Sequence, residues 1–537
     1  MPVEADSSPL IAALCDSACY PHPVDRIAVL ETHISWVILT GRYAYKIKKP
    51  LNLGFLDFST LEARRHYCGE ELRLNRRFAP SIYEAVVTII GSVHKPCIGG
   101  HGTIIEYAVR MREFAQGALA SQLLTDGVIT GAHIDALAAR VAALHADSDV
   151  VARDNAFGSP EAVIAPALDN FMHPGRLQTG VANQARISEL RAWTEQECSA
   201  QRAQFIAREA AGCVRECHGD LHLGNIAMLD GRLTPFDCIE FNPALRWIDV
   251  MSEVAFLVMD LTDRGRADFA TRFLNAYLEA SGDYAGLSVL RFYLVYRAMV
   301  RAKVHALRAA QHATADAEHA RLIAASSGYI GLAQQLAHDK CPAIILMHGM
   351  SGSGKSGIAQ GLAEHSGAIH LRSDIERKRL SGLAPLSRSA STLDSGIYTA
   401  DLTRATYNRL LEITCTAARA GYTAIVDATF LKGWQRDLFR RQAHARCIPF
   451  VIVDVTAPEA VLRKRIATRL AARSDASEAD QAVLTRQLTL SEALTREESS
   501  AVLHIDTTRS DKETTRREAS VALRTLLNTE RVVAPPI

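Results

Sequence analysis

One short stretch, GMSGSGKS at 349–356, restricts the fold of this chain more than any other feature. The apolar run AIILMH precedes it and a helical pattern follows, which predicts a buried strand, a glycine loop and a helix. Farther along, strand-like AIVDATF and FVIVDVT alternate with helical segments, the pattern of a parallel sheet. We therefore expect an α/β fold with a mostly parallel sheet over residues 339–537.

The glycine loop has the composition of a phosphate cradle. Glycines let backbone N–H groups wrap around a phosphate, and the N-terminus of the following helix adds favourable charge. The lysine is expected to reach the β- and γ-phosphates, and the last serine to coordinate Mg²⁺. The residues predicted to bind ATP and Mg²⁺ here are Gly349, Ser351, Gly352, Ser353, Gly354, Lys355 and Ser356.

Polar residues follow two predicted strands beyond this loop. Asp374 comes just after the run IHL, where it could accept a proton from an acceptor hydroxyl, and Arg377 lies one helical turn later, where it could hold an anionic group. Asp427 in IVDAT ends another strand and is predicted to act on Mg²⁺. This arrangement favours a kinase over a motor protein.

Three arginines downstream share one helix face. Arg465, Arg469 and Arg473 recur every four residues, so a helix aligns them in one stripe. Such a stripe could close as a lid over the transferring phosphate. The alternative is a solvated helix face, and the spacing alone does not separate the two.

A second site is predicted in the stretch ECHGDLHLGN at 216–225. Phosphoryl transfer needs a carboxylate to position the acceptor, and carboxylate and amide oxygens to hold Mg²⁺ against the phosphates. Asp220, Asn225 and Asp237 have the order and spacing of such a set. The segment MLDGRL between the last two contains Asp-Gly, which predicts a β-hairpin.

A lysine and a glutamate upstream should complete this second site. Lys46, in the strand-like YAYKIKK, is the best candidate for contacting phosphates, and Lys48 on the same strand face is the alternative. A helix is predicted from Ser59 to Phe78, with Ser59 as N-cap and Glu62 completing a capping box. Its Glu62, Glu70 and Glu71 are the candidates for the partner, with Glu62 as the working choice.

Zinc is a competing interpretation of the same region. Cys213, Cys217, His218 and His222 are close together in the sequence, although their spacing is not a usual structural-zinc pattern.

The motifs HGDLHLGN and FDCIEF resemble the aminoglycoside phosphotransferase and choline kinase-like group of small-molecule kinases. The resemblance covers roughly residues 25–310 and implies a bilobal, protein-kinase-like α+β fold. It implies Asp220 as catalytic base, Asn225 and Asp237 as Mg²⁺ ligands, and His218 as a supporting residue. This stretch of about 25–310 has no G-x-G-x-x-G loop, which puts a protein substrate in doubt.

Residues 342–530 resemble the P-loop kinases of the polynucleotide kinase, gluconate kinase and zeta-toxin type. Together the two parts look like bacterial fusions of an aminoglycoside phosphotransferase-like domain with an AAA-type ATP-binding domain. The expected domains are residues 1–338, with a small lobe at about 20–115 and a large lobe at about 116–338, and residues 339–537.

Composition limits the partners. Lys plus Arg (60) nearly balances Asp plus Glu (59), so nucleic acid is not the expected partner. Neither a secretory signal nor an apolar run of about 20 residues is evident. Eleven cysteines in 537 residues do not form a disulfide framework. A cytoplasmic protein without membrane contact is expected, and the oligomeric state stays open.

We therefore expect a bifunctional kinase that uses MgATP in both parts and transfers phosphate to small alcohols or amines. For the N-terminal acceptor, Asp249, Asp260 and Asp263 could contribute to an acidic pocket, although Asp249 could equally be structural. The alternatives are a nucleotide-gated regulator, in which one part controls the other, and a nucleic-acid end kinase in the C-terminal part.

Overall fold

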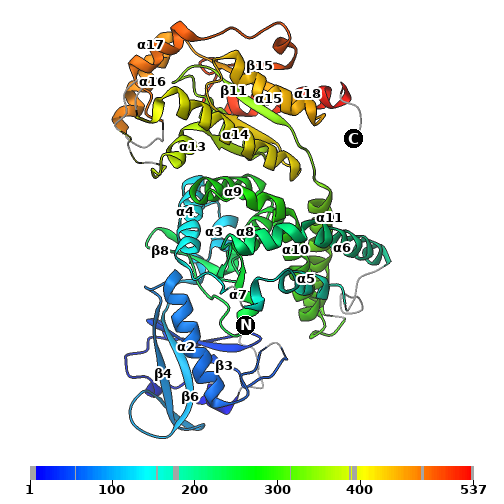
Figure 1. Ribbon diagram of the computed structural model, residues 1–537. Helices are drawn as coiled ribbons and strands as arrows, with labels where there is room; N and C mark the ends of the chain where they lie inside the picture. The colour runs from blue at the N-terminus through cyan, green and yellow to red at the C-terminus, as the bar shows by residue number, and fades with distance from the viewer. Residues whose placement is uncertain are drawn as a thin grey trace. The chain divides into compact units, whose positions relative to one another are not determined.

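The computed structural model describes residues 8–54, 56–152, 155–172, 181–314, 316–385, 387, 389, 396–472 and 477–533 (Figure 1). Close contacts divide the chain into two compact units. The first comprises Met1–Pro166 and Phe205–Asp260, and the second comprises Ala167–Gln204 and Leu261–Ile537. The border predicted between residues 338 and 339 therefore falls inside the second unit.

A six-stranded antiparallel sheet begins the first unit. In space its strands follow the order β1-β2-β3-β6-β4-β5. The strands are β1 (Ala28–Glu31), β2 (Ser35–Leu39), β3 (Tyr43–Lys48), β4 (Tyr83–Ser92), β5 (Lys95–Ile98) and β6 (Ile104–Arg112). A turn at Gly41 and Arg42 joins β2 to β3, with Gly41 at φ 89°. Before the sheet lie α1 (Pro9–Ala13) and the short η1 (Ser17–Cys19).

Helix α2 (Leu61–Phe78) packs on one face of this sheet, with Cys68 buried among Ala44, Tyr83 and Val109. Its predicted start is one residue too early. Thr60 is the N-cap and accepts a hydrogen bond from Ala63 N, whereas Ser59 donates its hydroxyl to Asp57. Glu62 is thus the second helical residue and cannot close a capping box.

The rest of the first unit is mainly helical and carries the loop of the second predicted site. The hairpin predicted at MLDGRL is present, and its Asp230 and Gly231 have φ of 47° and 75°. The elements are η2 (Gln116–Ala118), α3 (Ala120–Thr125), α4 (Gly131–Asp147), η3 (Ala156–Gly158), β7 (Val214–Glu216), η5 (Leu223–Asn225), β8 (Ile226–Leu229), β9 (Arg232–Pro235), α7 (Pro243–Arg246) and β10 (Trp247–Asp249).

Three helices span residues of both units, or lie at their border. They are α5 (Pro160–Asp169), α6 (Val181–Ala210) and α8 (Val250–Asp263). The second unit continues with α9 (Ala267–Ser281), η6 (Tyr284–Gly286), α10 (Leu287–Ala309) and α11 (Ala317–His338). The last of these ends four residues before Pro342, whose ring disfavours a helix just ahead of it.

A five-stranded parallel sheet forms the centre of the C-terminal part. Its spatial order is β12-β13-β11-β14-β15, and all four pairings are parallel. The strands are β11 (Ile344–His348), β12 (Ile369–Arg372), β13 (Ala424–Asp427), β14 (Phe450–Thr456) and β15 (Val502–Asp506). This is the α/β P-loop fold predicted from the glycine loop.

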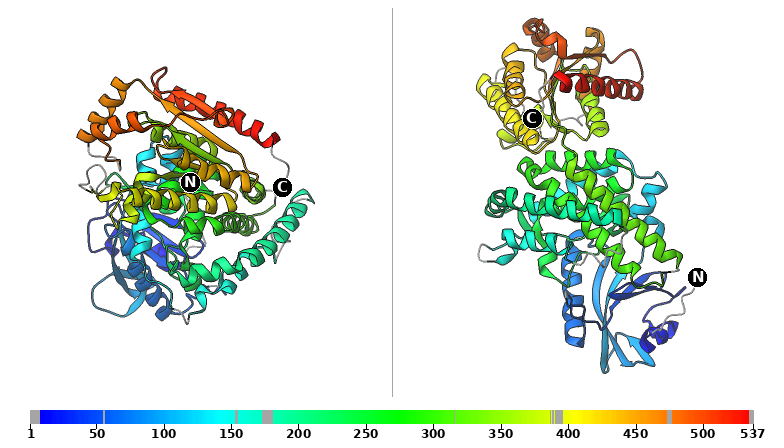
Figure 2. Two further views of the ribbon diagram at one scale, coloured as in Figure 1. Left: turned by 45° about the horizontal axis from the view of Figure 1, so that its top comes forward. Right: turned by 90° about the vertical axis from the view of Figure 1, so that its right-hand side faces the viewer.

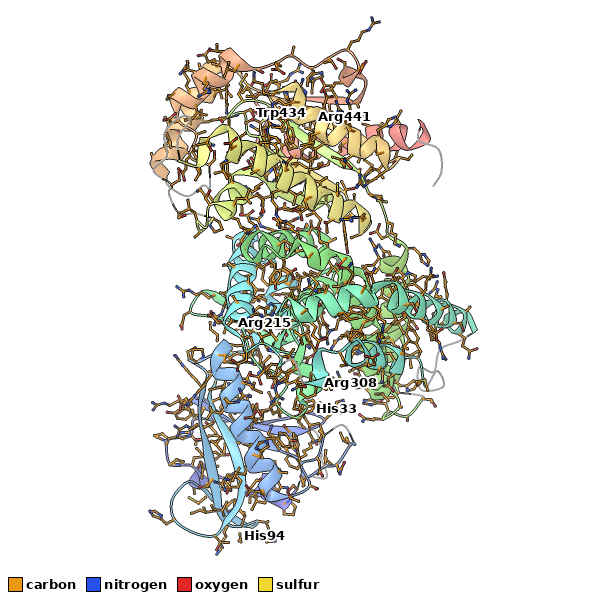
Figure 3. All side chains as sticks on the ribbon, in the orientation of Figure 1. His33, His94, Arg215, Arg308, Trp434 and Arg441 are labelled. Atoms are coloured by element: carbon orange, nitrogen blue, oxygen red, sulfur yellow. The ribbon has the colours of Figure 1, made fainter. Side chains whose placement is uncertain are left out.

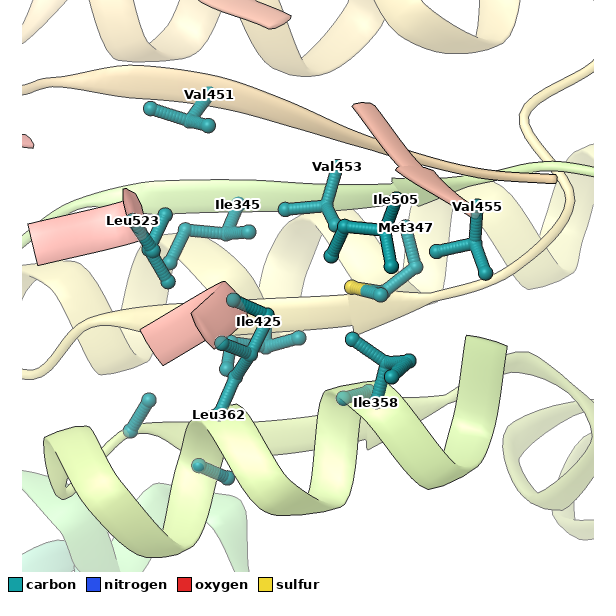
Figure 4. Packing of buried hydrophobic residues seen from close by; sticks show 14 of the residues in the cluster. Ile345, Met347, Ile358, Leu362, Ile425, Val451, Val453, Val455, Ile505 and Leu523 are labelled. Atoms are coloured by element: carbon teal, nitrogen blue, oxygen red, sulfur yellow. The ribbon is translucent and has the colours of Figure 1, made fainter. Parts of the chain in front are cut away.

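Helices cover both faces of this sheet (Figure 2). The helices of this part are α12 (Lys355–Ser366), α13 (Ser373–Leu380), η7 (Gly396–Tyr398), α14 (Ala400–Arg419), α15 (Gly433–Ala445), α16 (Glu459–Ala472), α17 (Gln481–Leu490), η8 (Glu498–Ala501) and α18 (Lys512–Val533), of which α12, α14, α15 and α18 contact the strands. On one face, Ile358 and Leu362 of α12 and Leu523 of α18 pack with sheet residues such as Val453 and Ile505 (Figure 4). Every second strand residue points into this core.

Helices α9 and α10 pack against the P-loop part, which explains their place in the second unit. Helix α9 contacts α12 and β12, and α10 contacts α14. Arg272 pairs with Glu364 at 3.0 Å, and the guanidinium of Arg291 lies 5.1 Å from the ring centre of Tyr422. Among the helices of the described residues, none combines the length and the apolar character required to span a bilayer.

Candidate active sites

The N-terminal site is organised around Lys46 on β3. Its Nζ lies 2.7 Å from Glu71 Oε1 on α2 and 2.5 Å from Asp237 Oδ1. Lys48, two residues later on the same strand face, is fully buried between Glu71, at 2.8 Å, and Glu240. Only Lys46 of the two lysines reaches Asp237, so Lys46 is the one placed at the phosphate site.

Glu62, the working choice for the lysine partner, is wrong. Its side chain is 80% exposed and contacts only Arg65, at 3.7 Å, among the ion pairs of the described residues. Nine residues separate it from Glu71, which is two and a half helical turns, so the two side chains project from opposite faces of α2. Glu70 pairs with Arg73 at 2.9 Å, and Glu71 alone of the three candidates contacts Lys46.

Charge compensation keeps this buried cluster ionised. Burial alone would raise the pKa of Glu71, but the ammonium groups of Lys46 and Lys48 outweigh it and hold that pKa at about 2. Burial likewise opposes the charged form of Lys46, whose pKa is nevertheless raised by Asp237 and Glu71. The lysine therefore remains a cation in the folded protein.

The loop after β7 brings Asp220 and Asn225 together. Asn225 Nδ2 donates to Asp220 Oδ2 at 2.9 Å and to the Asp220 carbonyl at 3.0 Å. The Asp220 carboxylate is 37% exposed, with His222 Nε2 at 3.4 Å. A carboxylate held in this way and open to solvent can accept the proton of an approaching hydroxyl.

Asp237 lies beside this pair and has an unusual backbone. Phe236 N donates to the Asn225 carbonyl at 2.9 Å, which connects the two segments. Asp237 has φ of 62°, its N–H donates to Tyr83 Oη at 3.1 Å, and its side chain is 43% exposed. Non-glycine residues in this region of backbone space are uncommon and concentrate at functional sites.

Side chains of neighbouring elements support the loop that carries Asp220. Glu253 of α8 accepts the Gly219 N–H at 2.7 Å and lies 3.1 Å from His145 Nε2. Gly219 has φ of 88°, and a Cβ there would lie 2.7 Å from the Leu245 carbonyl, so only glycine fits. Arg215 (Figure 3) donates to three carbonyls at the end of α4, which ties β7 to that helix.

His218 has the supporting place that the resemblance implied. It is completely buried, and its Nε2 lies 2.8 Å from the Phe236 carbonyl. Burial lowers the pKa of His218, which favours the neutral ring.

Two of the three aspartates suggested for an acidic acceptor pocket are structural. Asp249 is buried and pairs with Arg208 through contacts of 2.6 and 2.8 Å. Asp260 is buried and accepts the Leu223 N–H at 2.9 Å. Asp263 is the last residue of α8, and its proposed role stays a prediction.

The zinc interpretation gains no support from geometry. Among the described residues, the one cluster of metal-ligating side chains is His145, Cys217 and Glu253, which contains only one member of the predicted set. Two of its members already contact each other, as His145 and Glu253 are 3.1 Å apart.

The glycine loop between β11 and α12 forms the P-loop site. Gly349 has φ of 133°, and a Cβ there would lie 2.3 Å from the Val455 carbonyl, so the loop requires glycine at its start. Lys355 Nζ donates to the Met350 carbonyl at 2.8 Å, and burial lowers the pKa of Lys355 to about 8. Ser351 is engaged by Gln487 of α17, which accepts its N–H at 2.8 Å and donates to its hydroxyl at 3.0 Å.

A cavity of about 350 Å³ opens beside this loop. Its lining includes the loop residues Ser351, Gly352, Gly354, Lys355 and Ser356. Beyond the loop residues, the lining includes Asp374, Arg377, Tyr398, Tyr407, Arg469 and Gln487. The cavity thus joins the predicted phosphate cradle to the predicted acceptor residues.

Asp427 ends β13 next to the loop, as predicted. It is 6% exposed, and its Oδ2 lies 3.3 Å from His370 Nε2 of the neighbouring strand β12. Burial would raise its pKa, but His370, Lys355 and a hydrogen bond from Ser356 hold the pKa of Asp427 below its ordinary value. An ionised carboxylate beside a serine hydroxyl is a donor set that fits Mg²⁺.

Asp374 and Arg377 both line the cavity from the first turns of α13. Arg377 is 8% exposed and donates to the Ile397 carbonyl and to Thr403 Oγ1, each at 3.0 Å. Its guanidinium lies 5.3 Å from the ring centre of Tyr398, and its buried Nε has no hydrogen-bond partner among the described residues. A buried cation with an unsatisfied donor suits an anionic group.

Two of the three stripe arginines lie among the described residues, and they make different contacts. Arg465 donates to the Ser353 carbonyl at 3.1 Å and to Thr507 Oγ1 at 2.8 Å, so it braces the glycine loop. Arg469 lines the cavity and donates to the Ala479 carbonyl at 2.8 Å. Arg473 lies outside the described residues, and its predicted role is untested.

Several site residues escaped the sequence analysis. Glu240, Glu253, His370 and Gln487 have no local signature, because each acts across a tertiary contact. Tyr398 lies at the end of η7, and nothing in its sequence neighbourhood indicates the cavity. Alternation along the strand places Lys46 and Lys48 on one face of β3. It could have paired them with Glu71 only if the face of α2 that packs on the sheet had been known.

Comparison with known proteins bears on both parts of the chain. A family model for an AAA domain matches residues 344–494. The uncharacterized proteins Rv2004c of Mycobacterium tuberculosis and Mb2027c of Mycobacterium bovis are each 32% identical over 469 residues. These alignments cover 86% of this chain and 91% of each relative. An alignment of 469 residues is longer than either predicted domain, so it includes parts of both.

Similar solved structures fall into two groups. A gluconokinase from Sinorhizobium meliloti is 23% identical, covers 36% of this chain and 99% of its own, and has a TM-score of 0.28. A choline/ethanolamine kinase family protein from Mesorhizobium loti is 12% identical, covers 59% of this chain and 94% of its own, and has a TM-score of 0.33. The amicoumacin kinase hAmiN, in complex with AMP-PNP, is 16% identical, with 61% and 94% coverage and a TM-score of 0.38.

Proposed function

Because this chain belongs to the family of these mycobacterial proteins and carries two sets of phosphate-handling residues, we propose that it is an ATP-dependent phosphotransferase with two sites. The N-terminal site would act on a small alcohol or amine, and the P-loop site would act on a second small acceptor. The observation that carries the proposal is the grouping of Lys46, Asp220, Asn225 and Asp237 in the first unit.

In the N-terminal site, each residue has a separate task. Lys46, held by Glu71, would neutralise phosphate oxygens of ATP. Asp220 would orient the acceptor and take its proton as the new O–P or N–P bond forms, while the bond between the γ-phosphorus and the bridging oxygen breaks and ADP leaves. Asn225 and Asp237 would hold Mg²⁺, which when bound offsets the charge of the phosphates.

In the P-loop site, the cavity supports transfer to an acceptor with an anionic group. Lys355 and the loop N–H groups would cradle the phosphates, and Ser356 and Asp427 would hold Mg²⁺. Asp374 would take the acceptor proton, and Arg377 would bind the anionic group through its unsatisfied Nε. Arg469 would offset the charge that develops on the transferring phosphoryl group.

A metabolite screen tests the proposal. The full chain is incubated with ATP carrying labelled γ-phosphate and with pools of small metabolites, and mass spectrometry follows gains of one labelled phosphoryl group. Products that disappear with Asp220→Asn belong to the N-terminal site, and those that disappear with Asp374→Asn belong to the P-loop site. Asp401→Asn, an exposed change on α14, is the matched control. Absence of any labelled product from the wild type would contradict the proposal.

Nucleotide binding tests whether the two sites are separate. Calorimetric titration with a nonhydrolysable ATP analogue should give two binding events in the wild type. Lys355→Ala should remove one event and Lys46→Ala the other, since each lysine belongs to its own phosphate site. Loss of both events from either single change would favour a nucleotide-gated regulator.

The screen also separates the remaining alternative. Oligonucleotides with 5′-hydroxyl ends, added to the metabolite pools, would be phosphorylated if the P-loop part is a nucleic-acid end kinase. The near-equal numbers of basic and acidic residues, 60 and 59, favour small acceptors instead.

A further inference from the structure

His370 is a largely buried histidine to which the proposed function gives no role. It lies on β12, one of the two outer strands of the parallel sheet, and its Nε2 is 3.3 Å from Asp427 Oδ2 on the neighbouring strand. Both side chains are nearly inaccessible, with exposed fractions of 9% and 5%. Because water hardly reaches these two side chains, they hydrogen bond to each other, and this contact fixes the orientation of both.

Asp427 is thus held from two directions. His370 contacts it from β12, and Ser356 hydrogen bonds to it from the start of α12. A carboxylate that must present one oxygen to a cation gains orientation from a partner on its other oxygen, and losing that partner typically lowers metal affinity or activity about 10–100-fold.

The position of His370 is fixed in turn by α9. The His370 N–H donates to Asn275 Oδ1 at 2.8 Å, and Asn275 Nδ2 donates to the Ala368 carbonyl at 2.9 Å. One side-chain amide therefore supplies the donor and the acceptor that a neighbouring strand would offer at the open edge of β12. Arg272 with Glu364, and Glu279 with Arg372, add ion pairs at 3.0 and 3.4 Å along the same helix.

We propose that His370 is a positioning residue that orients Asp427 toward the cation of the P-loop site, and that Asn275 holds His370 in place through β12. The proposal rests on the proposed function, because it takes Asp427 as a Mg²⁺ ligand. It adds that the P-loop site depends on a helix that precedes the glycine loop by about 80 residues in the chain.

The test measures nucleotide affinity with and without Mg²⁺ in the full chain. The binding event of interest is the one that Lys355→Ala removes, titrated with a nonhydrolysable ATP analogue in MgCl₂ or in EDTA. His370→Leu should weaken this event about tenfold in MgCl₂ and leave it nearly unchanged in EDTA. His370→Gln, whose amide can place a donor near Asp427, should restore most of the affinity.

Two further variants separate positioning from folding. Asn275→Ala should lower the affinity in MgCl₂ in the same direction as His370→Leu, and by a smaller factor, because it acts through the backbone of β12. His444→Leu, an exposed histidine in the last turn of α15, is the matched control and should change neither affinity.

The possible results are distinct. Unchanged affinity of His370→Leu in MgCl₂, or equal losses in MgCl₂ and EDTA, would overturn the positioning role. A wild-type event that does not depend on Mg²⁺ would instead contradict the assignment of Asp427 in the proposed function.

Discussion

Asp237 combines a proposed role as a Mg²⁺ ligand with a backbone conformation that few side chains accept. Its φ is 62°, a region that aspartate and asparagine tolerate better than other non-glycine residues. Asp237→Asn therefore removes the charge while keeping the backbone, and it should abolish MgATP binding and transfer at the N-terminal site. Calorimetry and the labelled-phosphate assay measure the two effects.

Asp220→Asn should separate binding from turnover at the same site. The change removes a base but no ligand of the nucleotide, so we expect nearly unchanged MgATP affinity and a kcat lower by about 10²–10⁴-fold. Wild-type turnover in both this variant and Asp237→Asn would show that the loop is not the catalytic one.

Glu71 and Glu62 offer a matched pair on one helix. Glu71→Gln leaves Lys46 and Lys48 buried with too little negative charge, which should lower the free energy of unfolding by about 3–5 kcal/mol. Glu62→Gln, on the exposed face, should change it by less than about 0.5 kcal/mol. Urea denaturation followed by circular dichroism compares them, and similar losses for both would contradict the assignment of Glu71.

At this scale, the sequence predicts residues that a short motif places together. Asp220 and Asn225 share one loop, and Asp237 follows after a two-strand hairpin, so spacing sufficed. The partner of Lys46 could not be chosen in this way, because three glutamates lie on α2 and the choice depends on which face meets the sheet. His370 and Gln487 likewise depend on tertiary contacts alone.

Helix α8 supports the catalytic loop through Glu253, and this support should depend on pH. Burial would raise the pKa of Glu253, but His145 and the Gly219 N–H hold it at about 2, below its ordinary value of 4.5. A lowered pKa in the folded state stabilises the fold above about pH 4.5, and that stabilisation is lost as the pH falls toward 2.

Glu253→Gln should therefore lower the free energy of unfolding at pH 7 by about 3 kcal/mol, and the difference from wild type should shrink below pH 4.5. Urea denaturation at pH 7 and pH 3 measures this change, with Glu62→Gln as the exposed control. A difference that stays constant with pH would show that the charge of Glu253 contributes nothing.

Helix α13 presents two faces with different partners. Asp374 and Arg377 line the cavity, whereas Glu376 and Arg379 pair with each other, and Arg379 also donates to the Glu279 carbonyl of α9. Asp374→Asn should lower kcat at the P-loop site by about 10²–10⁴-fold and leave ATP affinity nearly unchanged. Parallel loss of affinity and turnover would indicate a metal-binding role for Asp374 instead.

Most elements that form the sites follow from sequence pattern. The strand before the glycine loop and the hairpin at Asp230 and Gly231 are present as predicted. The start of α2 was misplaced by one residue because Ser59 and Thr60 are both good caps, and only the backbone shows which of them accepts the Ala63 N–H.

The division of the whole molecule was harder to predict. Near residue 340, a proline and the change from helical to strand-like periodicity mark a connection in the chain. Neither feature indicates which helices pack against the parallel sheet. Helices α9 and α10 precede that connection and yet group with the parallel sheet in one compact unit. Their contacts with β12, α12 and α14 are tertiary, so no local signal could have placed them there.

Separate expression of residues 1–338 and 341–537 tests this grouping. The second fragment lacks α9, so it loses the hydrogen bonds from Asn275 and the ion pair between Arg272 and Glu364. We expect it to bind MgATP more weakly than the full chain does, whereas a fragment starting at residue 261 should keep the full affinity. Equal affinity of the two fragments would show that α9 is dispensable.

The side chain of Asn275 also has a consequence for one open edge of the parallel sheet. An uncovered outer strand offers unpaired N–H and C=O groups to any other strand, which is a common route to aggregation. In this chain one asparagine amide closes the edge of β12 at Ala368 and His370. Without it, two copies could join their sheets edge to edge, so the helix that supports the P-loop site also protects the sheet against self-association.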